Sequence, residues 1–198
     1  MSNQIVTNIE VQSENRDRLT VFLRLFTSLP IFVFLYLFQQ FNTNGWSSLV
    51  LALPVVAALV VRNVYPSWLL NFNHAVLEFS ARVAAYVLLL TDDYPTFERN
   101  PKVAVLLPDV EGGKRLNRWM PLVKWFLAIP LYIVGSVYLL MTFVATILAW
   151  ALTSLTGTYP AWAGEITLNT LRFWNRVYGY AFVLVTDEYP SFLLSNGN

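Results

Sequence analysis

The sequence predicts an all-α integral membrane protein made of two tandem copies of one unit, in which a helical hairpin is followed by an amphipathic helix. Three observations lead to this expectation. Of the 198 residues, 56% are hydrophobic and 13% are charged, against about 25% charged residues in an ordinary soluble domain. No charged residue occurs over 25–61 or over 125–164. The phrase TDDYPTF at 91–97 returns almost unchanged as TDEYPSF at 186–192, which is typical of an internal repeat.

The two uncharged stretches predict the hairpins. Each is nearly twice as long as the roughly 20 residues with which one helix crosses a bilayer. We therefore expect one transmembrane hairpin over about 20–64 and another over about 120–158. The turn of the first is predicted at 42–45 (Asn-Thr-Asn-Gly), and 135–136 (Gly-Ser) is the candidate turn of the second. In a rival arrangement the hairpins are re-entrant and never fully cross, bent by Pro30, Pro54 and Pro130.

An amphipathic helix is expected after each hairpin, over about 67–91 and about 161–186. At about 100° per residue, the polar side chains of each segment fall on one narrow arc. As a membrane span, the first helix would place Glu78 and Arg82 near the bilayer centre, at about 2.5–3.5 kcal/mol each. A helix that lies flat in the interface avoids this cost, so both are predicted to lie on the cytoplasmic face. The polar arcs consist of Asn71, His74, Glu78 and Arg82, and of Glu165, Asn169, Arg172 and Arg176.

Further matches divide the chain into a first copy, 1–100, and a second copy, 101–198. Arg24 corresponds to Lys124 and Pro30 to Pro130. Because each copy would hold an even number of spans, both have the same orientation, related by an axis along the membrane normal. Short alternating segments near the beginning of each copy, the second at 102–108, are expected to pair as strands on the cytoplasmic side.

Each amphipathic helix has a Tyr-Pro-x-aromatic phrase at both ends. Tyr and Trp prefer the headgroup level, and the residue before a proline leaves helical geometry, so these phrases are predicted to end helices and to anchor their corners. The eight interface anchors are Tyr65, Trp68, Tyr94, Phe97, Tyr159, Trp162, Tyr189 and Phe192. The Thr and Asp side chains of the terminal phrases are expected to bond freed backbone groups. Alternatively, the acidic residues contact a cation or a partner's Arg; these are Asp92, Asp93, Asp187 and Glu188.

The basic residues predict the orientation. If both hairpins cross, all 13 Lys and Arg residues lie on one side of the bilayer, which the positive-inside rule makes cytoplasmic. We therefore expect a multi-pass membrane protein with both termini in the cytoplasm. The basic residues either set this orientation alone or also bind anionic lipid headgroups. The residues predicted to bind headgroups are Arg18, Arg24, Arg82, Lys114, Arg115, Arg118, Lys124, Arg172 and Arg176.

The doubled phrase and its surroundings resemble the family of bacterial integral membrane proteins known as domain of unknown function 4389. The repeated unit of that family looks like an Arg-Leu entry, an apolar hairpin with a proline, and an Arg-containing helix that leads into a TDEYPPF-like phrase. The resemblance covers nearly the whole chain as two copies, although Thr96 and Ser191 stand where the family often has a second proline. It implies a location in the bacterial inner membrane and supplies no activity.

The residues point to no catalytic chemistry. There is no Cys and one His, His74, which excludes a thiolate nucleophile and a pair of His metal ligands. The net charge of +1 does not indicate a nucleic-acid binder. The uncharged stretches lack the ionisable groups that a proton relay needs. We expect no enzyme, no cofactor and no metal.

The predicted function is therefore that of a non-catalytic membrane scaffold or accessory subunit. Its cytoplasmic amphipathic helices would form a platform for a partner protein or for anionic lipid. The expected partners are membrane lipids, other membrane-protein subunits or further copies of the chain. The alternative is a channel or transporter for lipid or apolar solutes with a path between the two copies. Its polar lining would include Gln39, Gln40, Thr142, Thr146 and Thr153.

Overall fold

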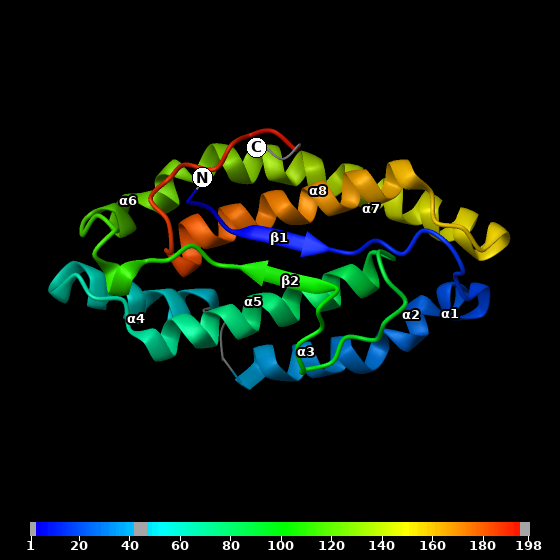
Figure 1. Ribbon diagram of the computed structural model, residues 1–198, viewed down its shortest axis with the longest axis horizontal. Helices are drawn as coiled ribbons and strands as arrows, with labels where there is room; N and C mark the ends of the chain where they lie inside the picture. Colours follow the sequence, from blue (N-terminus) through cyan, green and yellow to red (C-terminus); the bar gives the residue numbers. More distant parts are fainter. Residues whose placement is uncertain (1–2, 42–46, 195–198) are drawn as a thin grey trace.

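The computed structural model describes residues 3–41 and 47–194, with the side chains of 37–51 left out of the description. As predicted, the described chain is mostly helical, and it carries one small two-stranded sheet (Figure 1). The elements of the first copy are β1 (Val6–Ile9), α1 (Arg18–Phe22), α2 (Arg24–Thr27), α3 (Leu29–Phe41), α4 (Ser47–Arg62) and α5 (Ser67–Val87). Those of the second are β2 (Val103–Leu106), the 3₁₀ turn η1 (Glu111–Gly113), α6 (Met120–Leu127), α7 (Ile129–Thr156), α8 (Ala161–Tyr178) and the π-helical turn η2 (Gly179–Val183).

The sheet lies in front of α5 and α8 in the view of Figure 1. Strands β1 and β2 pair antiparallel, with Val6 opposite Leu106 and Ile9 opposite Val103, so the prediction of two paired strands is confirmed. Each strand is bonded to the amphipathic helix of the other copy. The Arg172 guanidinium in α8 donates to the Thr7 carbonyl of β1 at 3.1 Å. His74 Nε2 in α5 lies 2.6 Å from a carbonyl oxygen of β2.

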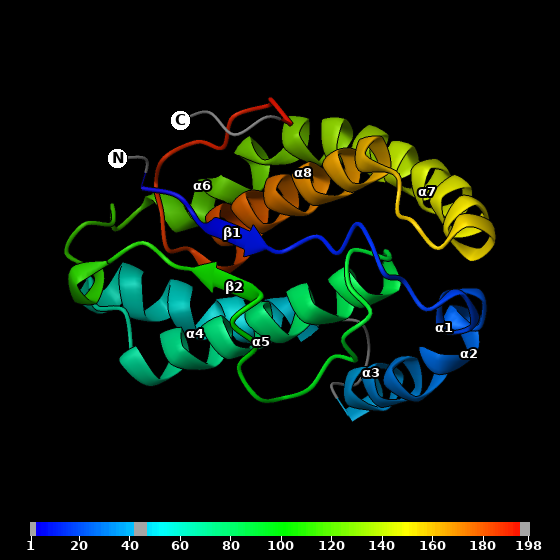
Figure 2. The same cartoon turned by 45° about the vertical axis from the view of Figure 1, so that its right-hand side comes forward.

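The predicted turn at Gly135-Ser136 is wrong, and no hairpin forms over 120–158. Helix α7 runs without interruption from Ile129 to Thr156 and lies antiparallel to α8 (Figure 2). Gly135 is needed there for close packing, since a Cβ atom on it would lie 2.7 Å from the Trp174 ring of α8. Glycine costs a helix only about 1 kcal/mol, which tertiary packing can outweigh.

The predicted turn of the first hairpin, at 42–45, lies outside the described residues. Helices α3 and α4 on either side of it follow one another along the length of the molecule in both views (Figures 1 and 2). The chain then returns through α5, as it returns from α7 through α8. In both copies, therefore, the apolar stretch runs one way and the amphipathic helix runs back.

The amphipathic helices form as expected, but they end differently. Tyr94 follows Tyr65 by 29 positions and Tyr189 follows Tyr159 by 30, so the second copy is one residue longer here. The π-helical turn η2 occurs in that copy at this place, and a π turn is a means of accommodating an inserted residue. Beyond it the two copies coincide again, because Leu89 and Leu184 both have a left-handed backbone, with φ of 65° and 62°.

The two copies also exchange contacts at their ends. The Tyr65 hydroxyl donates to the Val183 carbonyl at 2.6 Å, and the Tyr159 hydroxyl donates to the Leu88 carbonyl at 3.4 Å. Two arginines bind the last carbonyls of helices from the opposite copy, where a cation is favourable. Arg18 donates to Thr156 at the end of α7 at 3.0 Å, and Arg118 to Val61 near the end of α4 at 3.0 Å. The copies are thus interlocked instead of forming separate units.

Gly135→Ala should lower the stability of the protein. The added methyl group would press on the Phe173 and Trp174 rings, and overpacking of this kind costs about 1–3 kcal/mol, more than the roughly 1 kcal/mol that alanine adds as a helix former. The thermal midpoint in detergent should fall by about 2–4 °C for each kcal/mol of net loss. Ser136→Ala, at an exposed neighbouring position, is the control and should melt close to the parent. Equal midpoints for the two variants would contradict the packing described here.

Candidate functional site

The first terminal phrase holds a buried ion cluster. Asp92 forms ion pairs with Arg24 and, at 3.1 Å, with Arg16. Arg16 Nη2 also donates to the Leu89 carbonyl at 2.8 Å, and the Arg24 guanidinium lies 4.1 Å from the centre of the Tyr86 ring. Burial lowers the pKa of Arg16, and the Asp92 charge opposes this shift. Both arginines are withdrawn from solvent, with 5% and 3% exposure.

The second terminal phrase repeats the arrangement with a lysine. Lys124 Nζ lies 2.7 Å from Asp187 Oδ1 and donates to the Thr186 carbonyl at 2.7 Å. The ring of Tyr180, which corresponds to Tyr86, lies 5.2 Å from the ammonium group. Lys124 is fully buried, which lowers its pKa, whereas the bond to Asp187 raises it. Each half therefore ties an inward-facing cation of its entry helices to the Asp of its terminal phrase.

The remaining polar groups of the two phrases also match. The Thr91 hydroxyl accepts from the Asp93 amide at 3.2 Å, and the Thr186 hydroxyl accepts from the Glu188 amide at 3.1 Å. These bonds are of the kind that the sequence predicted for the Thr side chains. Asp93 pairs with Lys102 at the surface, and Glu188 accepts from the Asn3 amide. All four acidic residues named from the sequence thus contact groups of this chain. Among the described residues no group of three or more His, Asp or Glu side chains could hold a metal ion.

The eight predicted interface anchors fall into a buried group and an exposed group. Tyr65 and Tyr159 are only 3% and 4% exposed and bond to the opposite copy, so these two do not lie on the surface. The other six have exposed rings: Trp68, Tyr94, Phe97, Trp162, Tyr189 and Phe192.

The basic residues predicted to bind headgroups differ in their exposure and in their partners. Arg24 and Lys124 are buried and form ion pairs, and Arg82 and Arg176 are buried in α5 and α8. Arg18 and Arg118 bind carbonyls at helix ends, Arg172 binds β1, and Arg115 pairs with Glu111 at 2.8 Å. Lys114 is exposed. The structure thus shows internal partners for most of these side chains. The matching cations at 24 and 124, set within apolar segments, were the sequence signal that could have identified the ion pairs.

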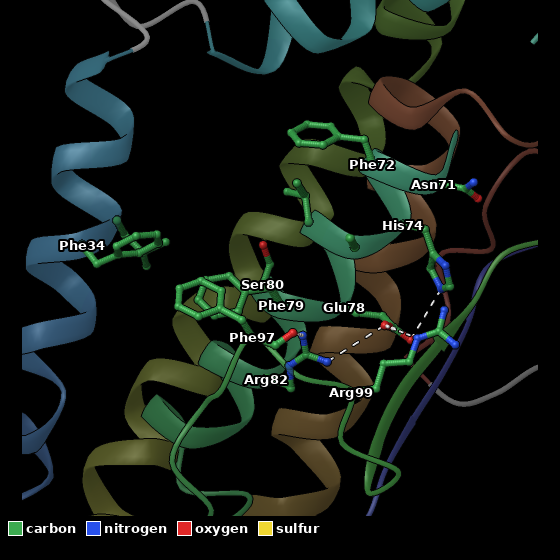
Figure 3. A pocket seen from close by; sticks show the side chains of 13 residues that line it. Phe34, Asn71, Phe72, His74, Glu78, Phe79, Ser80, Arg82, Phe97 and Arg99 are labelled. Carbon is green, nitrogen blue, oxygen red and sulfur yellow. Dashed lines mark hydrogen bonds and ion pairs between the residues drawn. The ribbon is translucent and has the colours of Figure 1, made fainter. Parts of the chain in front are cut away.

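A pocket of about 730 Å³ opens between α3 and α5 (Figure 3). Phe34 on α3 faces Phe79 on α5 and Phe97 beyond it, and the Phe79 and Phe97 rings stack with centroids 4.7 Å apart. The polar wall contains Glu78, which lies 4.0 Å from Arg82 and 3.9 Å from Arg99. Asn71, Phe72, His74 and Ser80 are among the other lining residues. The pocket thus combines an aromatic wall with a charged one, which suits a ligand that is itself amphipathic.

Comparison with known proteins found no matching family model, no matching curated protein and no matching solved structure.

Within the described part of the chain, α7 is the one helix long and apolar enough to span a membrane. Of its most apolar stretch of 18 residues, 22% is buried inside the protein. Shorter apolar helical segments occur at Arg24–Tyr36 and Ala52–Arg62.

Asp92→Asn should destabilise the protein strongly. It removes the carboxylate that balances Arg16 and Arg24, whose side chains are 0% and 4% exposed, and breaking a buried pair in this way costs about 3–5 kcal/mol. Asp93→Asn is a matched control one residue away, since the Asp93 and Lys102 side chains are 39% and 50% exposed and solvent screening leaves such a pair little effect on stability. Denaturant unfolding in detergent measures both. A loss for Asp92→Asn no larger than that of the control would refute the assigned role of the cluster.

Proposed function

We propose that the protein is a non-catalytic scaffold of the plasma membrane, immersed through its apolar helices and presenting the sheet and both termini to the cytoplasm. One observation carries the proposal. Arg24 and Lys124 are 3% and 0% exposed, whereas Phe26 and Phe126, two positions further on, are 69% and 73% exposed. A soluble protein distributes such residues the other way round, with charges outside and large apolar side chains inside.

The apolar surface supports the same proposal. On α7, Leu140, Phe143 and Leu155 are 65%, 63% and 75% exposed, and no charged residue occurs anywhere in that helix. Large apolar side chains are also exposed on α1, α2, α3 and α6. Apolar exposure on this scale marks a membrane or protein contact. Hydrocarbon is the occupant we propose for it, and further subunits or copies of the chain would pack on the same helices.

The arrangement of α7 favours immersion without crossing, the rival arrangement considered from the sequence. Basic residues stand at both ends of this helix, with Lys114, Arg115 and Arg118 before it and Arg18 bonded to its last turn. A crossing helix would place one of these groups on each side of the bilayer, against the positive-inside rule. A helix that lies within one leaflet keeps both groups on the cytoplasmic side. Its helical backbone satisfies its own hydrogen bonds in either case.

The scaffold would offer its water-facing side to other molecules. The sheet and the exposed Lys114 would provide polar and charged groups for a partner protein or for anionic headgroups, at about 1 kcal/mol for each basic residue near the membrane surface. The bacterial setting rests on the resemblance of the repeated phrase. No contact among the described residues favours the channel alternative: Thr142, Thr146 and Thr153 all lie on α7, and the side chains of Gln39 and Gln40 are not described.

Single cysteines test the immersion, because the chain has none of its own. In inside-out membrane vesicles, Glu10→Cys beside the sheet should react with a membrane-impermeant maleimide, since residue 10 is exposed. Leu140→Cys on α7 should not react, although its parent side chain is 65% exposed, because hydrocarbon would cover it. After denaturation in SDS both should react fully. Equal labelling of the two cysteines in intact vesicles would rule out the proposal.

A further inference from the structure

We propose that the pocket between α3 and α5 binds one amphiphile with an acyl chain and an anionic head, and that the second half of the chain has lost the corresponding space. A bilayer lipid and a free fatty acid share this chemistry. The inference deepens the proposed function and rests on it, since the membrane is the source of such a ligand.

The apolar part of the site can accommodate a chain. The main pocket, of about 730 Å³, is walled by Phe34, Phe79 and Phe97. A second hollow of about 300 Å³ adjoins it, because Leu35 and Ser80 line both. The second hollow continues along α5 and its lining is almost wholly apolar. Together the two form a groove within the size range of small-molecule sites.

The polar end of the site holds Arg82, whose ion pair with Glu78 Oε2 is long, at 4.0 Å, and leaves hydrogen-bond donors of the guanidinium unused. Arg82 is 5% exposed, and its Nε and Nη1 atoms have no hydrogen-bond partner among the described residues. Its Nη2 atom donates to the Phe97 carbonyl at 3.4 Å. A buried guanidinium with unbonded N–H groups is costly, and a carboxylate or phosphate oxygen would supply the missing acceptor.

The charge balance of the pocket favours an anion. Arg82 and Arg99 both line it, and Glu78 is the one carboxylate among the lining residues. His74 Nε2 lies 2.6 Å from a carbonyl oxygen of β2 and 3.5 Å from Glu78 Oε1. Two positive charges against one negative leave the pocket positive, so a ligand with a single negative charge would balance it.

The second half shows why this space is specific to the first. With Pro30 aligned on Pro130 and Tyr65 on Tyr159, Leu35 corresponds to Gly135 and Ser80 to Trp174. In the second half the Trp174 ring fills the space over Gly135 and stacks on Tyr132 with centroids 6.5 Å apart. Where the first half has Ser80, therefore, no ring closes the gap. The two halves share a fold and differ at this site at two corresponding positions, with Leu35 against Gly135 and Ser80 against Trp174.

Ser80→Trp tests the inference by placing in the first half the residue that closes the second. Position 80 is exposed, so the variant should fold like the parent. Native mass spectrometry of the full chain in detergent, titrated with dioleoyl phosphatidylglycerol, oleate or dioleoyl phosphatidylcholine, should show one bound anionic amphiphile on the parent. The variant should bind it at least about tenfold more weakly, because the introduced indole ring would occupy the space that the ligand needs.

Arg82→Gln tests the polar end, with Arg176→Gln as its matched control. Arg176 is the corresponding, equally enclosed residue of α8 and is 9% exposed, so both changes carry a similar cost in stability. Loss of a charge-assisted bond should weaken binding of the anionic probes about tenfold or more in the first variant. The control should bind as the parent does.

Binding of oleate without phosphatidylglycerol would assign the site to a free fatty acid, and retention of phosphatidylglycerol would assign it to a membrane lipid.

Three results would overturn the inference: no bound amphiphile on the parent, undiminished binding to Ser80→Trp, or binding of phosphatidylcholine as tight as that of the anionic probe. These failures can be distinguished from a failure of the proposed function, because the cysteine labelling of Leu140 reports immersion whether or not the pocket is occupied.

Discussion

The rest of the structure depends on one constraint. Two cations have to point into the protein and away from the exposed apolar surface of the helices. Arg24 and Lys124 belong to the segments that lead into α3 and α7, and each turns inward to an Asp of a terminal phrase. A charge on the outer face of these segments would interrupt the apolar surface, and a charge inside is tolerated only when it is paired. The repeated TDDYPTF and TDEYPSF phrases supply the paired carboxylates, Asp92 and Asp187. This explains why the chain contains nearly the same motif twice.

The pairs also determine how the halves are joined. Once each terminal phrase is fixed against the entry helices of its own half, the residues just before it receive hydrogen bonds from the opposite half, through Tyr65 and Tyr159. The strands cross over in the same way, each lying on the amphipathic helix of the other copy. The result is one interlocked body with an apolar surface and a small polar sheet.

Much of the fold could be predicted from periodicity, and much of the site could not. The amphipathic helices and paired strands follow from local patterns, which act over a few residues. The uninterrupted α7 was missed because Gly135 is a turn residue when viewed alone, and its packing partner Trp174 is distant in sequence. The matching positions of Arg24 and Lys124 were visible, but their pairing with Asp92 and Asp187 requires a return of the chain that no local pattern encodes. The pocket depends on two linked differences, Ser80 against Trp174 and Leu35 against Gly135, whose meaning appears only when the halves are compared in space.

In the arrangement that we propose, the continuous apolar helix α7 lies within one side of the bilayer, and the charged groups at both of its ends face the cytoplasm. Single cysteines at Lys114 and Thr158, which flank α6 and α7 and are both exposed, test it most directly. With an impermeant maleimide, both should be labelled in inside-out vesicles and neither in intact right-side-out vesicles. Labelling of one from each side would show that α7 crosses the membrane and would contradict the account.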